Sequence, residues 1–368
     1  MKVLIVAPRI CTPWTEGRKK FVCDLIAAAS PRWQLCGLVT VDRGESTQLP
    51  PGFDSHTVSS TKEHLLYLTN NLKRALALHK PDLVCHFPFG TFSGLRGLGN
   101  LWAIASIART CRKAGVQCCT IMYSLTADAN TALHRLLLKD VYFNQYLGGK
   151  NGVRFGVRLA PNTDEFHAKS ARTLLFMSGA AEATAESLDY VLDVRGLRYL
   201  LKAGAALSRR QYRLIVAIPF LRDTDMLEKL RHHPDNQWES GGIEFRSEVA
   251  LPDVFRGVSA FVFPYGQEEK QFVPTSIVEA MHFGIPVVLP RLDFLAQFST
   301  GTPKALVHEP RAVDSLIAQV TRLSDEAEDI DAIRQRAAVF VDTEYSIANS
   351  VSDIEALYRN SAATSAAG

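Results

Sequence analysis

The residues from Phe261 to Pro290 leave few choices for the fold of this chain. They read FVFPYGQEEKQFVPTSIVEAMHFGIPVVLP, in which apolar runs at 261–264 and 285–289 flank a polar loop at 265–273 and a helix at 275–283. Short apolar runs of this kind are typical of parallel strands that are covered on both faces. Ligands of such sheets bind beyond the carboxyl ends of the strands, where helices begin. The stretch therefore predicts a doubly wound α/β unit with a ligand site at that edge.

The start of this helix is suited to an anion. Thr275 and Ser276 present backbone N–H groups that have no partner inside the helix and lie at the positive end of its dipole. A phosphate can bind there without a cationic side chain. Glu279 lies within the first two turns, close enough to bond a sugar hydroxyl beside that phosphate. The alternative is a purely structural strand–helix–strand unit with Glu279 on its surface.

The same stretch resembles the nucleotide-sugar motif of retaining GT-B glycosyltransferases of the large family-four group. Their pattern is roughly E-G-F-G-L-P-x-x-E-A-M-A-x-G-x-P-V-V, and this chain has Glu-Ala-Met from Glu279 and Gly-Ile-Pro-Val-Val from Gly284. The second glutamate of the pattern holds the ribose in the family and falls on Glu279. The first glutamate, which faces the donor sugar, falls on Gln271, which forms hydrogen bonds but carries no charge.

The resemblance is broken at the cations that clamp the donor pyrophosphate. The family has an arginine in G-R-L and a lysine in K-G. Here Gly179 is followed by residues 180–194, an insertion without an arginine, and Arg195-Gly196-Leu197 then stands for the lysine motif. An arginine binds phosphate through two parallel hydrogen bonds, so Arg195 is the expected replacement. A helix-surface arginine is the alternative.

Candidate residues of the amino-terminal half follow its expected strands. Gly17 stands where the family commonly has two glycines between donor and acceptor, and would let the backbone approach the donor. Lys19 belongs to a basic run at a helix start, which opposes the helix dipole and suits an anionic acceptor. His86 and Tyr123 close two further strands and are acceptor-side candidates. A helix-entry glycine, a solvated basic face and a packed structural histidine are the alternatives.

Strand and helix patterns alternate along the chain, which predicts parallel sheets. The glycines at 94, 97 and 99 do not follow the first strand, which argues against an NAD-binding fingerprint. Other strands are expected at 2–7, 35–41, 82–85, 117–122, 173–178, 213–218 and 243–246. Other helices are expected at 18–29, 64–78, 101–113, 197–208, 223–231, 251–256, 312–323, 329–340 and 346–358, before a frayed Ser/Ala-rich tail from Asn360.

The length of 368 residues and an apolar content of 47% fit two domains with full cores. Residues 153–167 resemble the family segment that precedes the second domain. We expect an amino-terminal acceptor-binding domain at 1–167 and a nucleotide-sugar-binding domain at 168–345. Residues 346–368 would form a terminal helix that packs back on the first domain, plus the tail. The resemblance implies the GT-B architecture, in which two Rossmann-like domains face each other across a cleft.

Charge and cysteines bear on location. Residues 1–167 contain 20 Lys and Arg against 11 Asp and Glu, and the remainder contains 21 against 27. A basic half suits an anionic acceptor or a membrane surface, while scattered solvated charges explain it as well. The seven cysteines lie in the first third without metal-ligand spacing, which indicates reduced thiols. With no signal peptide and no stretch of 18 apolar residues, we expect a cytoplasmic protein, and peripheral attachment at the inner face of the membrane stays open.

The resemblance implies a glycosyltransferase that moves a sugar from a nucleotide sugar to a carbohydrate, lipid-linked or small-molecule acceptor with retention of configuration. No metal, other cofactor or nucleic-acid partner is expected. In the family the leaving phosphate is thought to take the acceptor proton, so the lack of an evident base does not exclude catalysis. Two alternatives stay open. Gln271 and the missing arginine favour a non-catalytic GT-B-fold binding or scaffolding protein, and nucleotide-sugar epimerases share the fold.

Overall fold

The computed structural model shows two compact units, each built on a six-stranded sheet. The first contains Met1–Arg158 and Tyr345–Gly368, and the second contains Leu159–Glu269 and Val273–Glu344. The structure describes residues 1–7, 17–41, 53–59, 65–88, 94–122, 141–143, 153–154, 156–157, 172–179, 183–247, 253–267 and 273–366. Every strand pair is parallel, which confirms the predicted α/β fold class.

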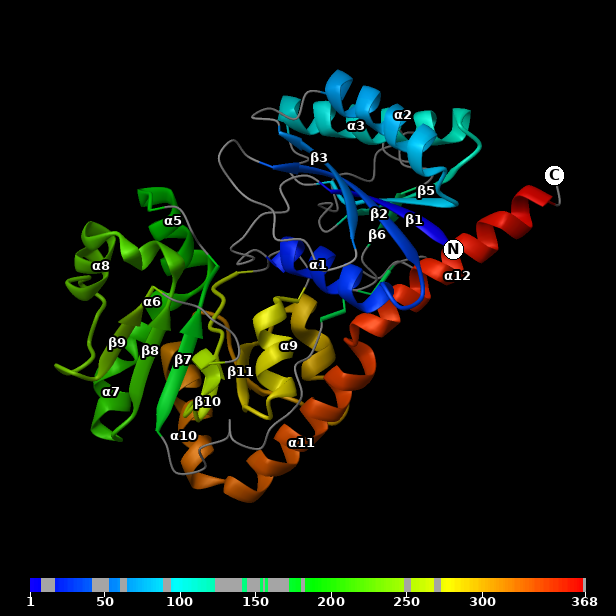
Figure 1. Ribbon diagram of the computed structural model, residues 1–368. Coiled ribbons are helices and arrows are strands. Elements are labelled where there is room, and N and C mark those ends of the chain that lie inside the picture. Colours follow the sequence, from blue (N-terminus) through cyan, green and yellow to red (C-terminus); the bar gives the residue numbers. More distant parts are fainter. Residues whose placement is uncertain are drawn as a thin grey trace. The chain divides into compact units, whose positions relative to one another are not determined.

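The first sheet has the strand order β3-β2-β1-β4-β5-β6 (Figure 1). Its strands are β1 (Lys2–Ala7), β2 (Gln34–Val41), β3 (Asp54–Ser59), β4 (Leu83–His86), β5 (Gln117–Met122) and β6 (Val141–Phe143). Its helices are α1 (Gly17–Ala29), α2 (Leu65–His79), α3 (Gly94–Lys113) and α12 (Ile347–Ala366). The central strand β1 is apolar along its length because both of its faces are covered.

Side chains that alternate along β1 divide the core of this unit in two. Ile5 packs in a cluster with α1 and α12 on one face, and Leu4 packs with α2 and α3 on the other (Figure 1). Arg154 fastens α12, since its guanidinium donates to both carboxylate oxygens of Asp353 at 2.9 and 3.0 Å.

The second sheet has the strand order β12-β11-β10-β7-β8-β9. Its strands are β7 (Thr173–Met177), β8 (Arg213–Ala217), β9 (Ile243–Arg246), β10 (Ala260–Val262), β11 (Val287–Pro290) and β12 (Leu306–His308). Its helices are α5 (Ala185–Asp189), the π-helical turn η4 (Tyr190–Val194), α6 (Leu197–Lys202), α7 (Gly204–Arg209), α8 (Thr224–Arg231), α9 (Thr275–His282), α10 (Val313–Asp325) and α11 (Ala327–Glu344). The 3-10 turns are η5 (Pro219–Arg222), η6 (Asp253–Phe255) and η7 (Asp293–Phe298).

Some expected elements differ from the structure. The helix expected at 101–113 begins at Gly94, the helix expected at 197–208 is interrupted at Ala203, and that expected at 251–256 is the 3-10 turn η6. The tail does not fray at Asn360 but continues α12 to Ala366, because alanine has the highest helix propensity. The strands β3, β6 and β12 were not predicted, and each lies at a sheet edge.

Two further observations concern the described residues. Their six cysteines are free thiols. Among the same residues, none of the helices combines the length and the apolar character needed to cross a membrane.

Candidate functional site

The strand order of the second sheet places a switch point between β7 and β10. The chain runs from β7 outward to β8 and β9, and from β10 in the opposite direction to β11 and β12. Crossover helices on the two sides of such a point diverge, and ligands bind in the crevice outside the carboxyl ends of the strands. Ser178 follows β7 at this edge, and the segment Phe263–Gly266 follows β10.

Two backbone segments meet closely at this edge. Gly196 has φ +77°, and a Cβ built on it would lie 1.8 Å from the carbonyl oxygen of Pro264. The backbone N–H of Gly266 donates to the carbonyl oxygen of Val194 at 3.0 Å. A Cβ on Gly266 would lie 2.4 Å from the carbonyl oxygen of Asp193. Only glycine fits at both positions, so the turn after η4 is pressed against the segment that leaves β10.

Arg195, the predicted phosphate ligand, lies in this turn and is held by two aromatic rings. Its guanidinium carbon lies 4.7 Å from the ring centre of Tyr265 and 5.1 Å from that of Tyr190. Such cation–π contacts orient the guanidinium plane without using its hydrogen-bond donors. The Arg195 Nε is buried and has no hydrogen-bond partner among the described residues. The guanidinium is thus positioned while donor capacity remains for an anion.

The neighbouring cation, Arg198, is committed elsewhere. Its Nε lies 2.9 Å from a carboxylate oxygen of Asp193 and 3.5 Å from one of Asp235. Asp193 belongs to the insertion at 180–194, whose described part forms α5 and η4. Thr184 caps α5 by accepting from the Ser187 N–H. The insertion therefore supplies a helical support before Arg195 and an acid that engages Arg198.

Two residues at this edge were not predicted from the sequence. Ser178 is 5% exposed, and its Oγ has no hydrogen-bond partner within the described ranges. Its place directly after β7 and before Gly179 was the only available signal. Arg311 follows β12, has φ +62°, and donates from Nε to the carbonyl oxygen of Gly266 at 2.5 Å. Nothing local marks Arg311, because its partner is 45 residues away in the chain.

The helix α9 contains the residues that were predicted to bind an anion and the ribose. It begins after Pro274, whose side chain provides no cap, and Thr275 and Ser276 are half-buried in its first turn. The backbone N–H groups of Thr275 and Ser276 lack partners inside the helix, while that of Ile277 donates to the Pro274 carbonyl oxygen at 3.0 Å. Glu279 is buried in the second turn, at 5% exposure, rather than lying on the surface. A buried carboxylate is costly unless it is paired or hydrogen-bonded, so its placement is specified by the fold.

The end of α9 is fixed by two features. Gly284 has φ +68°, and the N–H groups of Gly284 and Ile285 donate to Met281 and Ala280, as expected for a glycine that ends a helix. His282 Nδ1 lies 2.6 Å from a carboxylate oxygen of Asp342 in α11. The glycine of the Gly-x-Pro-Val-Val pattern therefore turns the chain into β11.

The first sheet has its own switch point, between β1 and β4, and His86 closes β4 there. His86 is 3% exposed, and its Nδ1 lies 3.4 Å from the Thr120 hydroxyl. Burial lowers the pKa of His86 from 6.5 to about 3, so the imidazole is neutral at ordinary pH. The structure thus gives His86 the features of a packed histidine, and an acceptor-side role for it stays a prediction.

The other candidates are described in part or not at all. Gly17 and Lys19 lie in the first turn of α1, of which the backbone alone is described. Gln271 and Tyr123 lie outside the described residues. No group of three or more His, Cys, Asp or Glu within the described ranges is arranged to hold a metal ion.

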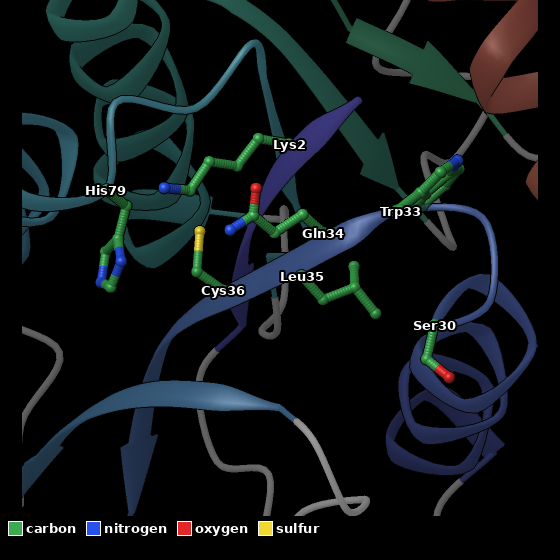
Figure 2. A pocket seen from close by; sticks show the side chains of 7 residues that line it. All are labelled: Lys2, Ser30, Trp33, Gln34, Leu35, Cys36 and His79. Carbon is green, nitrogen blue, oxygen red and sulfur yellow. The ribbon is translucent and has the colours of Figure 1, made fainter.

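A cavity of about 270 Å³ lies at the amino ends of β1 and β2, opposite the carboxyl ends of the strands in the first sheet (Figure 2). Lys2, Cys36 and His79 lie on the α2 side of β2, and Leu35 lies on the α1 side. Side chains alternate along a strand, so the cavity surrounds a strand end rather than opening into one face. It includes none of the predicted site residues.

Comparison with known proteins bears on the second unit first. Residues 185–326 match the family of glycosyl transferases group 1. This range contains Arg195, Glu279 and Arg311, together with both backbone contacts at the switch point. No curated protein sequence matches the chain.

Solved structures extend the comparison to the whole chain. HepE from Anabaena, solved with UDP, is 12% identical with a TM-score of 0.67, and the match covers 100% of both chains. Sucrose-phosphate synthase from Thermosynechococcus elongatus is 13% identical with a TM-score of 0.69, covering 99% of this chain and 100% of that one. A Listeria monocytogenes protein described as a UDP-N-acetylglucosamine 2-epimerase is 13% identical with a TM-score of 0.57, and the match covers 97% of this chain and 95% of that one.

At these identities the likeness concerns the fold. The chain has the GT-B architecture, as predicted, with two parallel-sheet α/β domains. Because a transferase and an epimerase both share it, the fold does not decide the reaction. The reaction must be argued from the site at the β7–β10 switch point.

Proposed function

We propose that the chain is a glycosyltransferase that takes a sugar from a nucleotide-sugar donor and binds the nucleotide diphosphate at the β7–β10 switch point. The observation that carries this proposal is the setting of Arg195. A close backbone contact at Gly196 and two aromatic rings hold this arginine at the edge where a doubly wound sheet binds ligands. The group 1 glycosyl transferase match over 185–326 supports the same assignment.

Each part of this edge has a role in the proposal. Arg195 and the free N–H groups of Thr275 and Ser276 bind the diphosphate, and Glu279 accepts hydrogen bonds from the ribose hydroxyls. Groups that are already oriented toward the developing charge stabilise the departing diphosphate without reorganising. The family resemblance assigns Gln271 to the donor sugar and Gly17 to the contact between donor and acceptor.

The proposed reaction retains the configuration of the sugar and needs no metal ion. The bond between the anomeric carbon and the phosphate oxygen breaks, and the acceptor oxygen forms its bond on the same face of the sugar. The acceptor proton passes to the departing phosphate oxygen. The cation and the helix dipole take the charge-stabilising role that a metal would otherwise supply.

A non-catalytic binding protein is the second candidate. It is favoured by Gln271 in place of the family glutamate and by the absence of a second arginine before Arg195. This candidate still binds nucleotide at the same edge, so turnover distinguishes the two.

Calorimetric titration with UDP, GDP, ADP and dTDP tests the donor site. Arg195→Ala should weaken binding of the preferred nucleotide about 10- to 100-fold, since a charge-assisted hydrogen bond contributes roughly 1.5–3 kcal/mol. Arg195→Lys should recover part of the loss, because it keeps the charge but not the planar fork. Arg213→Ala is the matched control, because Arg213 is an exposed arginine at the amino end of β8, on the opposite edge of the same sheet.

The reaction is tested by incubating the wild-type chain with nucleotide sugars of the preferred base and following nucleotide release and the anomeric configuration by NMR. Glu279→Ala should lose binding and turnover together. Binding that Arg195→Ala and Glu279→Ala leave unchanged would contradict the site. Normal binding without transfer or hydrolysis of any donor would favour the non-catalytic candidate.

A further inference from the structure

The helices α2 and α3 form a layer with an inner and an outer face. The inner face packs on the sheet, where Leu72 and Ile107 are fully buried in one cluster with Leu4. The Thr69 and Ser106 hydroxyls lie 3.3 Å apart, so the helices are side by side at this level (Figure 1). Both helices connect parallel strands of the same sheet, and they therefore run in the same direction.

Two large apolar side chains are exposed on the outer face. Trp102 of α3 is 66% exposed and Leu78 of α2 is 71% exposed. Trp102 lies one turn before the level of the Thr69–Ser106 contact, and Leu78 lies nine residues after it. At 1.5 Å per residue, the two side chains are about 20 Å apart along the layer. The other described tryptophans, Trp33 and Trp238, are buried.

The charged residues of α2 and α3 have one sign. Between Glu63 and Asp128 the sequence contains a single acidic residue, Asp82, which accepts a hydrogen bond from the backbone N–H of Lys2. The same stretch contains seven lysines and arginines: Lys73, Arg74, Lys80, Arg96, Arg109, Arg112 and Lys113. Neither α2 nor α3 contains an acidic residue.

Helical spacing puts three of the cations, Arg74, Arg109 and Lys113, on the same helix faces as Leu78 and Trp102. Arg109 and Lys113 follow Trp102 by seven and eleven residues and are exposed, as are Lys73 and Arg74 of α2. We call this surface the α2–α3 outer face, made of Lys73, Arg74, Leu78, Trp102, Arg109 and Lys113.

We propose that the α2–α3 outer face docks on an anionic lipid surface. Tryptophan prefers the boundary between headgroups and acyl chains, and nearby cations are attracted to anionic headgroups. Binding to a membrane surface increases with the buried apolar area and with the electrostatic attraction to anionic lipids, and this face offers both. Two isolated apolar side chains on a helix layer suit a flat boundary. The single sign of charge opposes pairing with a second copy of the same face.

This inference goes beyond the proposed transfer reaction and does not depend on it. The α2–α3 outer face belongs to the first unit, whereas Arg195 and Glu279 belong to the second. A chain that fails to bind nucleotide can still bind lipid, and the converse also holds.

Vesicle flotation of the full chain tests the proposal. Vesicles of phosphatidylcholine alone are compared with vesicles containing 30% phosphatidylglycerol, at low and at high salt. We expect binding to the anionic vesicles that weakens with salt. The triple variant Lys73→Ser/Arg74→Ser/Arg109→Ser should bind about 100-fold more weakly, since each cation near an anionic surface contributes about fivefold. Trp102→Ser/Leu78→Ser should also lose binding.

Matched variants come from exposed residues of the second unit. Arg222→Ser/Lys229→Ser removes exposed cations and Val339→Ser removes an exposed apolar side chain, and neither should change binding. Brominated lipids should quench tryptophan fluorescence in the wild-type chain and much less in Trp102→Phe. This readout reports on contact with lipid even where affinity changes little.

Three results would overturn the proposal. The first is equal binding to neutral and anionic vesicles, or none to either. The second is an equal loss of vesicle binding in the second-unit variants and in the outer-face variants. The third is a dimer that Trp102→Ser dissolves, or tighter binding of single-stranded nucleic acid than of anionic vesicles.

Discussion

Replacement of Gly196 by alanine tests the close contact that sets Arg195. Alanine at φ +77° costs roughly 1–2 kcal/mol by itself. Its Cβ would also lie 1.8 Å from the Pro264 carbonyl oxygen, so the two backbone segments must separate by more than an ångström. Separation endangers the hydrogen bond from Gly266 to Val194, which contributes about 1 kcal/mol. The expected total loss is about 3 kcal/mol or more.

Gly257→Ala is the control for this loss. Gly257 lies in the same unit with φ +74°, and a Cβ there would meet nothing within 4 Å. Gly257→Ala should therefore lower the free energy of unfolding by the conformational cost alone, about 1–2 kcal/mol. Urea unfolding followed through Trp238, which is buried in the core of this unit, measures both variants. A Tm difference of roughly 2–4 °C per kcal/mol should accompany the result.

Equal losses in the two variants would refute the reasoning, since the backbone contact at Gly196 would then contribute nothing. A loss at Gly196 with unchanged nucleotide affinity would separate stability from the proposed role of Arg195.

Three further predictions concern other elements. As the pH falls from 6.5 to 5, His86 should reduce the free energy of unfolding by about 2 kcal/mol, because burial lowers its folded-state pKa to about 3 while the unfolded chain takes up the proton near 6.5. Melting temperatures of His86→Gln should depend less on acid than those of the wild type, and an equal dependence would contradict this. Arg154→Ala and Asp353→Ala should each destabilise the first unit by about 1–2 kcal/mol, because the two hydrogen bonds between these side chains hold α12. The double-mutant cycle should give a coupling energy near 1 kcal/mol, and additive losses would argue against the contact. Asp342→Ala should cost about 1–2 kcal/mol, since it leaves the buried His282 imidazole without this acceptor, and an unchanged urea midpoint would show that the pair contributes little.

The missed strands show what limits prediction of the sheets. Central strands such as β1 are covered on both faces and therefore carry continuous apolar runs that are readable in the sequence. β3, with the sequence DSHTVS, has no such run, and β6 and β12 have only three residues each. These three are edge strands, each paired on one side only, and their short or polar sequences carry no long apolar run.

Of the candidate site, the sequence alone determined the order of elements from β10 to β11 and the glycine that ends α9. It also determined the carboxylate in the second turn of that helix, because apolar runs, helical spacing and a left-handed glycine are local properties. Only the tertiary structure decided that Glu279 is buried, that Arg195 lies on two aromatic rings, and that Ser178 and Arg311 belong to the same edge. These features arise where strands distant in the sequence bring their carboxyl ends together, and no local pattern encodes that meeting.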